Sequence, residues 1–205
     1  MKIALAGRNP HKLNEIRRIL NYANVEWLDP DALADMPEVV EDGLTFASNA
    51  VKKAMTTAFY SKCWALADDS GLEVTALQGA PGVMSARYAG VPHDDAANNS
   101  KLLRDLAGVS DRSARFCCVV ALADPKGRAQ VVEGFCAGRI IEVQRGAQGF
   151  GYDPLFVPDG YEQTFAEMDA ALKNRISHRA RALEQARDKW SELFRGDHAG
   201  WPTAR

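Results

Sequence analysis

The sequence lacks the features that mark membrane proteins, metal clusters and nucleic-acid surfaces. No apolar run approaches the length needed to cross a bilayer, and the apolar start at residues 2–6 is too short and too early for a signal peptide. The four cysteines show no Cys-x-x-Cys spacing and the four histidines are scattered, which argues against zinc. A net charge of −2 gives no general attraction for polyanions. We therefore expect a cytoplasmic protein with reduced cysteines and with no nucleic-acid or membrane partner.

What is present is typical of a soluble globular chain. The 205 residues are 46% apolar and 25% charged, and they contain no internal repeat, low-complexity tract or obvious linker. This length suits one domain over residues 1–205, either compact or built as two lobes that share one sheet.

Apolar periodicity and turn residues predict an α/β fold with a mixed sheet. Asp124-Pro125-Lys126-Gly127 is a strong turn signal and predicts a hairpin. Helices are expected at about 10–21, 45–61, 95–107 and from Ser177 to about 195. Strands are expected at 2–6, 63–67, 114–123, 128–136 and 137–143, with a further apolar stretch at 155–157.

The most informative local feature is a pair of adjacent carboxylates, Asp68 and Asp69, directly after the apolar run 63–67. Because Asp, Ser and Gly are turn formers, we expect Asp68 to Gly71 to be a turn leaving that strand. Adjacent carboxylates repel each other unless a cation lies between them, and oxygen ligands suit Mg²⁺, which often accompanies phosphate. A solvated turn with a helix cap is the alternative.

Two other segments offer groups for a phosphorylated ligand. Asn9 and Pro10 favour a helix start after the turn at Gly7, and Lys12 adds a charge to the anion-attracting helix N-terminus. The pattern is not a P-loop, so an ordinary turn with a surface lysine is the alternative. The acidic stretch 38–42 offers either a metal ligand or a solvated loop before a helix.

Two later segments offer groups for an aromatic ligand. In Gly149 to Asp153, a ring provides a stacking face and glycine permits close approach, although the aromatic residues could simply belong to the core. Lys173, His178 and Arg179 gather donors near the start of the last helix, where surface positions are the alternative.

Six ordered motifs together resemble the inosine triphosphate pyrophosphatase family. They are Gly-x-Asn-x-x-Lys-x-x-Glu at 7–15, Glu-x-Gly-x-Thr-Phe at 41–46, Ala-Asp-Asp-Ser-Gly-Leu at 67–72, Gly-Ala-Pro-Gly-x-x-Ser-Ala-Arg-Tyr at 79–88, Gly-Phe-Gly-Tyr-Asp-Pro at 149–154 and Ser-His-Arg at 177–179. Each motif alone is weak, but the ordered set covers nearly the whole chain.

The resemblance implies hydrolysis of ITP, dITP and XTP to the monophosphate and pyrophosphate. It also implies an elongated mixed sheet flanked by helices, two lobes with a central cleft, Mg²⁺ dependence and a homodimer.

The resemblance also implies a role for each motif. Mg²⁺ would be held by Glu41 and Asp69, while Asp68 would orient this set or bind a second ion. Asp69 would be the base that activates water for attack on the α-phosphorus. The phosphates would be bound by Gly7, Arg8, Asn9, Pro10, His11, Lys12 and Ser70. The purine would stack on Phe150, within the segment that includes Gly151 and Tyr152, and its edge would be read by Asp153, Lys173, His178 and Arg179.

The chain departs from the family pattern at two positions. Gly7 stands where the family usually has Thr or Ser, so one hydroxyl contact to phosphate is lost unless Arg8 compensates. Ser48 stands where the family usually has Glu, and Asp42 or Glu38 would have to replace any support that this Glu gives to metal or water.

Three rival functions remain open from the sequence. One is a pyrophosphatase of similar fold that acts on modified pyrimidine or 7-methylguanine nucleotides. Another is a weakly active nucleotide-binding protein, which the departures at Gly7 and Ser48 would explain. The third, an Asp-nucleophile phosphatase, is disfavoured because residues 3–9 contain no Asp.

Overall fold

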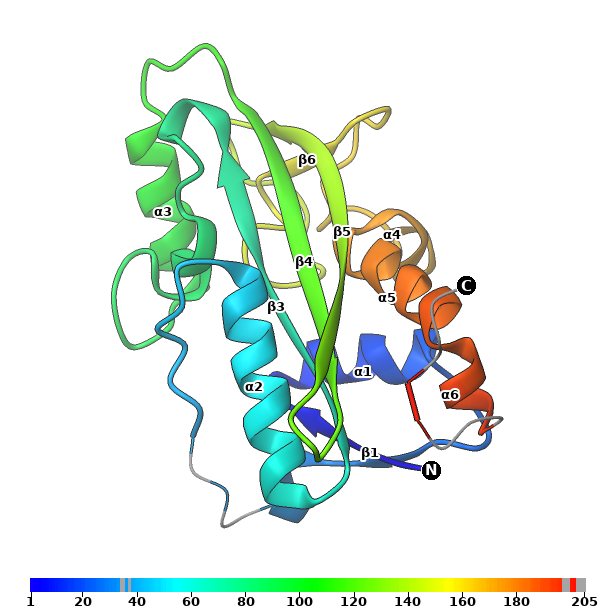
Figure 1. Cartoon of the computed structure of the whole chain (residues 1–205). Coiled ribbons are helices and arrows are strands. Elements are labelled where there is room, and N and C mark those ends of the chain that lie inside the picture. Colours follow the sequence, from blue (N-terminus) through cyan, green and yellow to red (C-terminus); the bar gives the residue numbers. More distant parts are fainter. Residues whose placement is uncertain (34–35, 37, 197–199, 202–205) are drawn as a thin grey trace. The chain divides into compact units, whose positions relative to one another are not determined.

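A computed structural model describes residues 1–33, 36, 38–196 and 200–201. These residues include a six-stranded sheet with the strand order β2-β1-β3-β4-β5-β6, flanked by helices (Figure 1). β1 pairs in parallel with both β2 and β3, whereas β5 and β6 are antiparallel. The sheet is therefore mixed and the α/β prediction is confirmed. Within the described residues, no helix combines the length and apolarity required to span a bilayer.

The strands are β1 (Lys2–Ala6), β2 (Glu26–Leu28), β3 (Trp64–Val74), β4 (Ser113–Ala123), β5 (Ala129–Ile140) and β6 (Phe156–Pro158). The α-helices are α1 (Pro10–Ile19), α2 (Phe46–Ser61), α3 (Asp95–Asp105), α4 (Ala170–Ile176), α5 (His178–Lys189) and α6 (Ser191–Arg195). Short 3₁₀ helices are η1 (Pro30–Leu33), η2 (Thr75–Leu77) and η3 (Gly82–Arg87).

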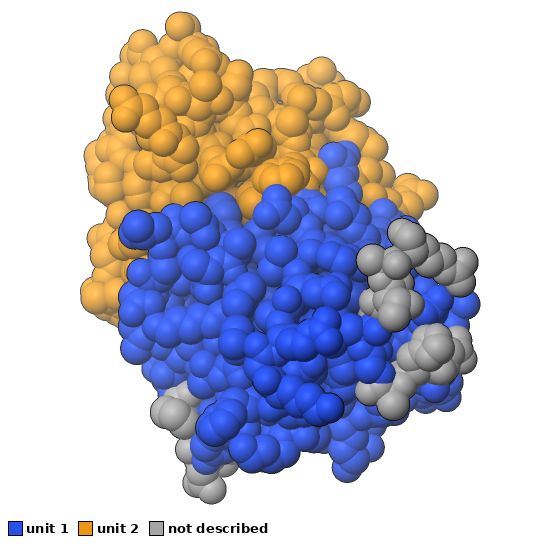
Figure 2. Space-filling view, in the orientation of Figure 1, with its two compact units in different colours: residues 1–69, 118–134, 180–205 blue, residues 70–117, 135–179 orange. Residues whose placement is uncertain are grey.

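The chain forms two compact units, coloured separately in Figure 2. Unit 1 comprises residues 1–69, 118–134 and 180–205, and unit 2 comprises residues 70–117 and 135–179. The backbone passes from one unit to the other within β3, β4, β5 and α5.

In unit 1, the two faces of the sheet carry residues of different size. Successive side chains of a strand point to opposite faces. Large apolar residues of β1 and β3, such as Ile3, Leu5 and Leu66, pack with α1, α5 and α6 in one core. The alternate positions in the same strands are alanines, and α2 also buries a row of alanines: Ala4, Ala6, Ala65, Ala67, Ala50, Ala54 and Ala58 are all at most 5% exposed. These small side chains allow α2 to pack closely on β1.

Unit 2 has its own core, rich in aromatic rings. Phe116 makes an edge-on contact with Phe156 and a stacked contact with Phe165. Leu72 and Val74 from β3 and Leu102 from α3 are fully buried in the same cluster. Each unit therefore has its own apolar core, and burial of that core stabilises the elements that carry the polar residues of the unit.

Most predicted elements are confirmed, but the ends of several of them were wrong. A separate strand at 137–143 does not form, because β5 continues through Gly138 to Ile140. A Cβ at Gly138 would lie 2.3 Å from Val157 O, so this glycine allows β6 to approach and is not a strand break. The last helix is also interrupted at Trp190, whose fully buried ring donates from Nε1 to Gln130 Oε1 at 3.1 Å. Helix α4 was not predicted.

Candidate active site

The Asp68–Gly71 segment is not a turn, and that prediction was wrong. β3 continues from Trp64 through both carboxylates to Val74. Residues that usually form turns stay extended here because their side chains find partners on the two faces of the strand. The strand periodicity then separates the adjacent Asp68 and Asp69 onto opposite faces.

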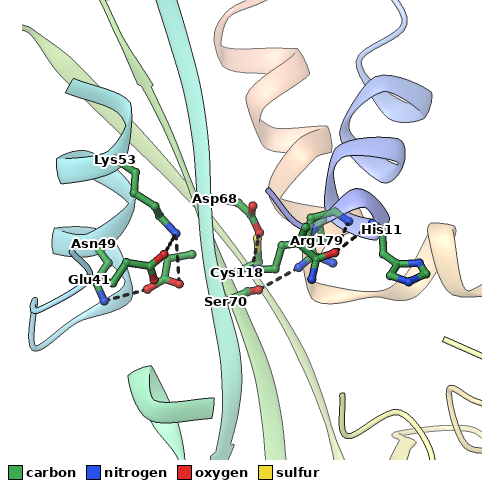
Figure 3. Close-up of polar contacts among 11 residues, drawn as sticks. His11, Glu41, Asn49, Lys53, Asp68, Ser70, Cys118 and Arg179 are labelled. Atoms are coloured by element: carbon green, nitrogen blue, oxygen red, sulfur yellow. Dashed lines mark hydrogen bonds and ion pairs between the residues drawn. The ribbon is translucent and has the colours of Figure 1, made fainter. Parts of the chain in front are cut away.

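Asp68 lies on the α1 face of β3 and is only 4% exposed. Its Oδ2 atom lies 3.3 Å from Lys12 Nζ, so the early lysine of α1 serves as its counter-charge. Cys118 Sγ on β4 lies 4.0 Å from the same oxygen. In Figure 3, Asp68 and Lys53 lie on opposite sides of the β3 ribbon.

Asp69 lies on the α2 face, where three polar side chains surround it. Asn49 Nδ2 donates to Asp69 Oδ2 at 3.1 Å, and Lys53 Nζ lies 3.7 Å from Asp69 Oδ1. Lys53 Nζ also donates to Glu41 Oε1 at 2.9 Å. Asn49 Oδ1 in turn accepts from Gly43 N at 2.8 Å, which ties the acidic loop to the start of α2. One buried ammonium group therefore faces two carboxylates from separate segments (Figure 3).

Burial sets the electrostatics of this group. Removal from water raises the pKa of Asp69 above its ordinary value, although the charges of Lys53 and Lys12 oppose the shift. Burial alone would lower the pKa of Lys53, but the carboxylates Asp69, Asp68 and Glu41 outweigh that effect and raise it. Lys53 therefore stays charged at neutral pH, and its ammonium group stabilises the Asp69 and Glu41 carboxylates where little water reaches them.

The donor chemistry around Asp69 fits Mg²⁺ once substrate oxygens are added. Among the described residues, no group of three or more His, Cys, Asp or Glu side chains is arranged to hold a metal. Two carboxylates, Glu41 and Asp69, do face a common cationic group. Because Mg²⁺ commonly takes one or two protein carboxylates and completes its shell with waters and phosphate oxygens, this pair suits it.

The predicted helix start is confirmed, but its backbone donors are used within the protein. Asn9 Oδ1 accepts from His11 N at 3.0 Å and from Lys12 N at 3.2 Å. Gly7 has a φ of +111°, a conformation that favours glycine. The positive φ of the backbone at position 7 thus explains why glycine stands at this departure from the family pattern. The segment contributes the ammonium group of Lys12 to the site.

A small cavity of about 130 Å³ adjoins Glu41 and Lys53 in unit 1. Its wall includes Gly7 and Arg8 from the segment after β1, together with apolar residues of η1. Residues predicted for phosphate and for metal therefore line one hollow.

In unit 2, the Gly149–Asp153 segment folds around the Asp153 carboxylate. Phe150 N donates to Asp153 Oδ2 at 2.9 Å, and Lys173 Nζ forms a buried ion pair with the same oxygen. A Cβ at Gly149 would lie 2.0 Å from that oxygen, so only glycine fits there. Lys173 Nζ also lies 5.0 Å from the centre of the Phe150 ring.

The Ser-His-Arg residues are buried in the same unit. Arg179 is 2% exposed, and its Nη2 donates to Ser70 Oγ at 2.9 Å (Figure 3). The Arg179 guanidinium carbon lies 5.8 Å from the Phe150 ring centre. The His178 ring stacks on Phe116 with the centroids 4.6 Å apart. These contacts place Asp153, Lys173 and Arg179 around Phe150, whereas His178 lies against Phe116.

Sequence reasoning missed Asn49 and Lys53. They share one face of α2 with Thr57, because positions four apart on a helix are neighbours. All three are polar yet at most 7% exposed, beside the buried row Ala50, Ala54 and Ala58. A lysine within an alanine-lined helix face was the signal that could have identified this site.

Comparisons with known proteins agree on one family. A family model described as the Ham1 family matches residues 3–189. A protein named dITP/XTP pyrophosphatase from Syntrophobacter fumaroxidans is 51% identical over 197 residues, covering 96% of this chain and 85% of that protein. Another of the same name from Desulforamulus reducens is 50% identical and covers 95% and 98%. The solved structure of a HAM1 protein from Coxiella burnetii is 40% identical, covers 94% and 99%, and has a TM-score of 0.88.

Proposed function

This chain belongs to the Ham1 family, and from that premise we propose that it hydrolyses the purine triphosphates ITP, dITP and XTP to the monophosphate and pyrophosphate. The observation that carries this proposal is the buried Asp69, which shares Lys53 with Glu41 and lies in the unit that also holds Lys12. A dehydrated carboxylate with a raised pKa is suited to accept a proton from water.

We assign the reacting end of the nucleotide to residues of unit 1. Asp69 acts as the base for a water that attacks the α-phosphorus. Lys12 and Lys53 offset the charge of the phosphates and of the leaving pyrophosphate, with Gly7 to His11 beside the chain of phosphates. Asn49 holds the Asp69 carboxylate in a fixed orientation through its 3.1 Å hydrogen bond.

Mg²⁺ would be held by Glu41 and Asp69 together with phosphate oxygens. When bound, the ion neutralises phosphate charge and polarises the phosphorus–oxygen bonds. Asp68 faces Lys12 instead of this pair, so any metal role for Asp68 requires a second ion.

We assign the base end of the nucleotide to residues of unit 2. Phe150 provides the stacking face, and Asp153, Lys173, His178 and Arg179 provide the polar groups. Hypoxanthine and xanthine carry a 6-oxo acceptor that buried donors can satisfy, whereas the 6-amino group of adenine would face them with another donor. Unsatisfied buried donors can reject the wrong ligand by orders of magnitude. Ser70, held by Arg179, would contribute a hydroxyl toward a phosphate oxygen.

We further propose that residues 1–205 function as one domain with two lobes, as a homodimer and in the cytosol. These proposals rest on the family resemblance and on the two compact units of the chain.

Pyrophosphate release tests the proposal directly. With Mg²⁺ present, we expect fast release from ITP, dITP and XTP and slow release from GTP, ATP, dTTP and UTP. Release from the pyrimidine nucleotides would favour the related pyrophosphatase instead. Binding of ITP without turnover would indicate a nucleotide-binding protein and would overturn the enzymatic role.

A further inference from the structure

We propose that Asp95 and Asn99 of α3 are positioning residues that set base selectivity by fixing the backbone N–H and C=O groups of Gly151. The inference rests on the proposed function and deepens it, because Gly151 directly follows Phe150, to which we assign the stacking contact with the purine. All the residues concerned belong to unit 2.

Both backbone groups of Gly151 are bound by side chains of one helix. Gly151 N donates to Asp95 Oδ2 at 2.8 Å, and Asn99 Nδ2 donates to Gly151 O at 3.0 Å. Residues four apart lie on the same face of a helix, so Asp95 and Asn99 form a two-point clamp. Gly151 has a φ of +62°, a conformation that few other residues adopt easily, and the clamp keeps it there.

The clamp acts on the residues that surround the base. Phe150 N donates to the Asp153 carboxylate, which also pairs with Lys173, so the backbone position of this turn determines where all three side chains lie. Tyr152 is held as well, since its hydroxyl donates to Ser85 O at 2.8 Å. Hydrogen-bond readout of a base depends on placement to within a fraction of an ångström. A change in α3 can therefore alter selectivity without contacting the nucleotide.

The neighbouring Asn98 shows what a purely structural asparagine looks like on the same helix. Asn98 Oδ1 accepts from Ala89 N at 2.7 Å and its Nδ2 donates to Ala86 O at 3.2 Å, so both ends of the amide are bonded. Asn99 is equally buried, but its Oδ1 has no hydrogen-bond partner among the described residues. A buried unsatisfied oxygen lowers stability. The hydrogen bond from Asn99 Nδ2 to Gly151 O is therefore the interaction that accounts for an asparagine at position 99.

Four variants separate positioning from folding. Asn99→Ala and Asp95→Ala each remove one arm of the clamp. Asp95→Asn is the conservative rescue, because an amide oxygen can still accept from Gly151 N. Asn98→Ala is the matched control, since it removes a buried asparagine of α3 that does not contact the turn. Each variant is assayed for pyrophosphate release from ITP, XTP, GTP and ATP, and its melting temperature is measured.

We expect Asn99→Ala and Asp95→Ala to raise the KM for ITP by about tenfold, the effect of losing one well-placed hydrogen bond. The preference for ITP over GTP and ATP should fall, while kcat for ITP stays close to that of the wild type because Asp69 and Lys53 are unchanged. Asp95→Asn should restore the preference. Asn98→Ala should lower the melting temperature and leave the preference intact.

Unchanged preference in both clamp variants, or an equal loss in Asn98→Ala, would overturn the inference while leaving the proposed function standing. Absence of pyrophosphate release from every purine nucleotide by the wild type would instead reject the proposed function, and this inference with it.

Discussion

Asp68 and Asp69 are consecutive in the chain, yet they lie on opposite faces of β3 and have different partners. Asp68 pairs with Lys12 of α1, whereas Asp69 contacts Asn49 and Lys53 of α2. A single ion held between the two carboxylates, as their adjacency first indicates, does not match this arrangement. Instead, Asp69 and Glu41 face the same cation, Lys53, and this arrangement is the basis of the proposed catalytic site.

Replacement of each aspartate should therefore give a different kinetic result. Asp69→Asn removes the proposed base while keeping a similar shape, and kcat for ITP should fall by a factor on the order of 10²–10⁴. Asp68→Asn should act mainly on KM, because it frees Lys12 from its partner without removing the base. Steady-state pyrophosphate release measures both effects, and near-normal kcat in Asp69→Asn would exclude that residue as the base.

Lys53 should matter for stability as well as for catalysis. Lys53→Met leaves the buried Asp69 and the half-buried Glu41 without their shared counter-charge. Loss of one partner from a buried ion pair such as Lys53–Asp69 costs about 3–5 kcal/mol. Thermal unfolding without metal should show this loss, and added Mg²⁺ should recover part of it by replacing the missing positive charge.

The neighbouring Lys52 provides the control for that experiment. Its ion pair with Asp42 is exposed, and exposed ion pairs contribute little to stability because water and salt screen them. Lys52→Met should therefore have little effect, with or without Mg²⁺. If Mg²⁺ stabilised the wild type, Lys52→Met and Lys53→Met by the same amount, the shared-cation arrangement would be wrong.

Ser48 should prove to act in the capping box of α2, whose N-cap residue is Thr45. Thr45 and Ser48 cap α2 reciprocally, since Ser48 N donates to Thr45 Oγ1 at 3.1 Å and Thr45 N donates to Ser48 Oγ at 3.2 Å. Ser48→Glu, the usual family residue, can form the same capping box and should preserve stability. Ser48→Ala should cost about 1 kcal/mol in urea unfolding. We expect kcat to change in neither variant, and a clear gain in kcat for Ser48→Glu would assign that position a catalytic role.

Asp105 should confer a stability that depends on pH. Hydrogen bonds from Lys101 at 2.6 Å and Tyr88 at 2.5 Å lower the pKa of Asp105 below its ordinary value of 3.8. A carboxylate with a lowered folded-state pKa stabilises the fold above its unfolded value and loses that contribution as pH falls through the folded value.

Asp105→Asn should therefore reduce the free energy of unfolding by about 1 kcal/mol at neutral pH, allowing for partial exposure. The difference from the wild type should shrink as pH falls below 3.8. Urea unfolding across this range provides the measurement, and a difference that does not change with pH would contradict the assignment.

The sequence predicted elements whose signals are local. Asn9 and Pro10 marked the start of α1 because a cap and a fixed φ act within one turn, and the Asp124–Gly127 turn identified the β4–β5 hairpin in the same way.

The features that local signals missed depend on tertiary partners. Asp68 and Asp69 stay within a strand because Lys12 and Lys53, distant in sequence, neutralise them on separate faces. Gly138 stays in β5 because β6 approaches it. Lys53 is buried in an otherwise apolar helix face because Glu41 and Asp69, which come from other segments, lie beside it.

Hydrolysis of ITP in oxygen-18 water identifies which phosphorus the water attacks. We predict that the label enters IMP and that the released pyrophosphate carries none, as attack at the α-phosphorus requires. Asp69→Asn should slow this labelling in proportion to kcat. Label in pyrophosphate, or release of inorganic phosphate as the first product, would show that water attacks another phosphorus and would rule out the proposed reaction.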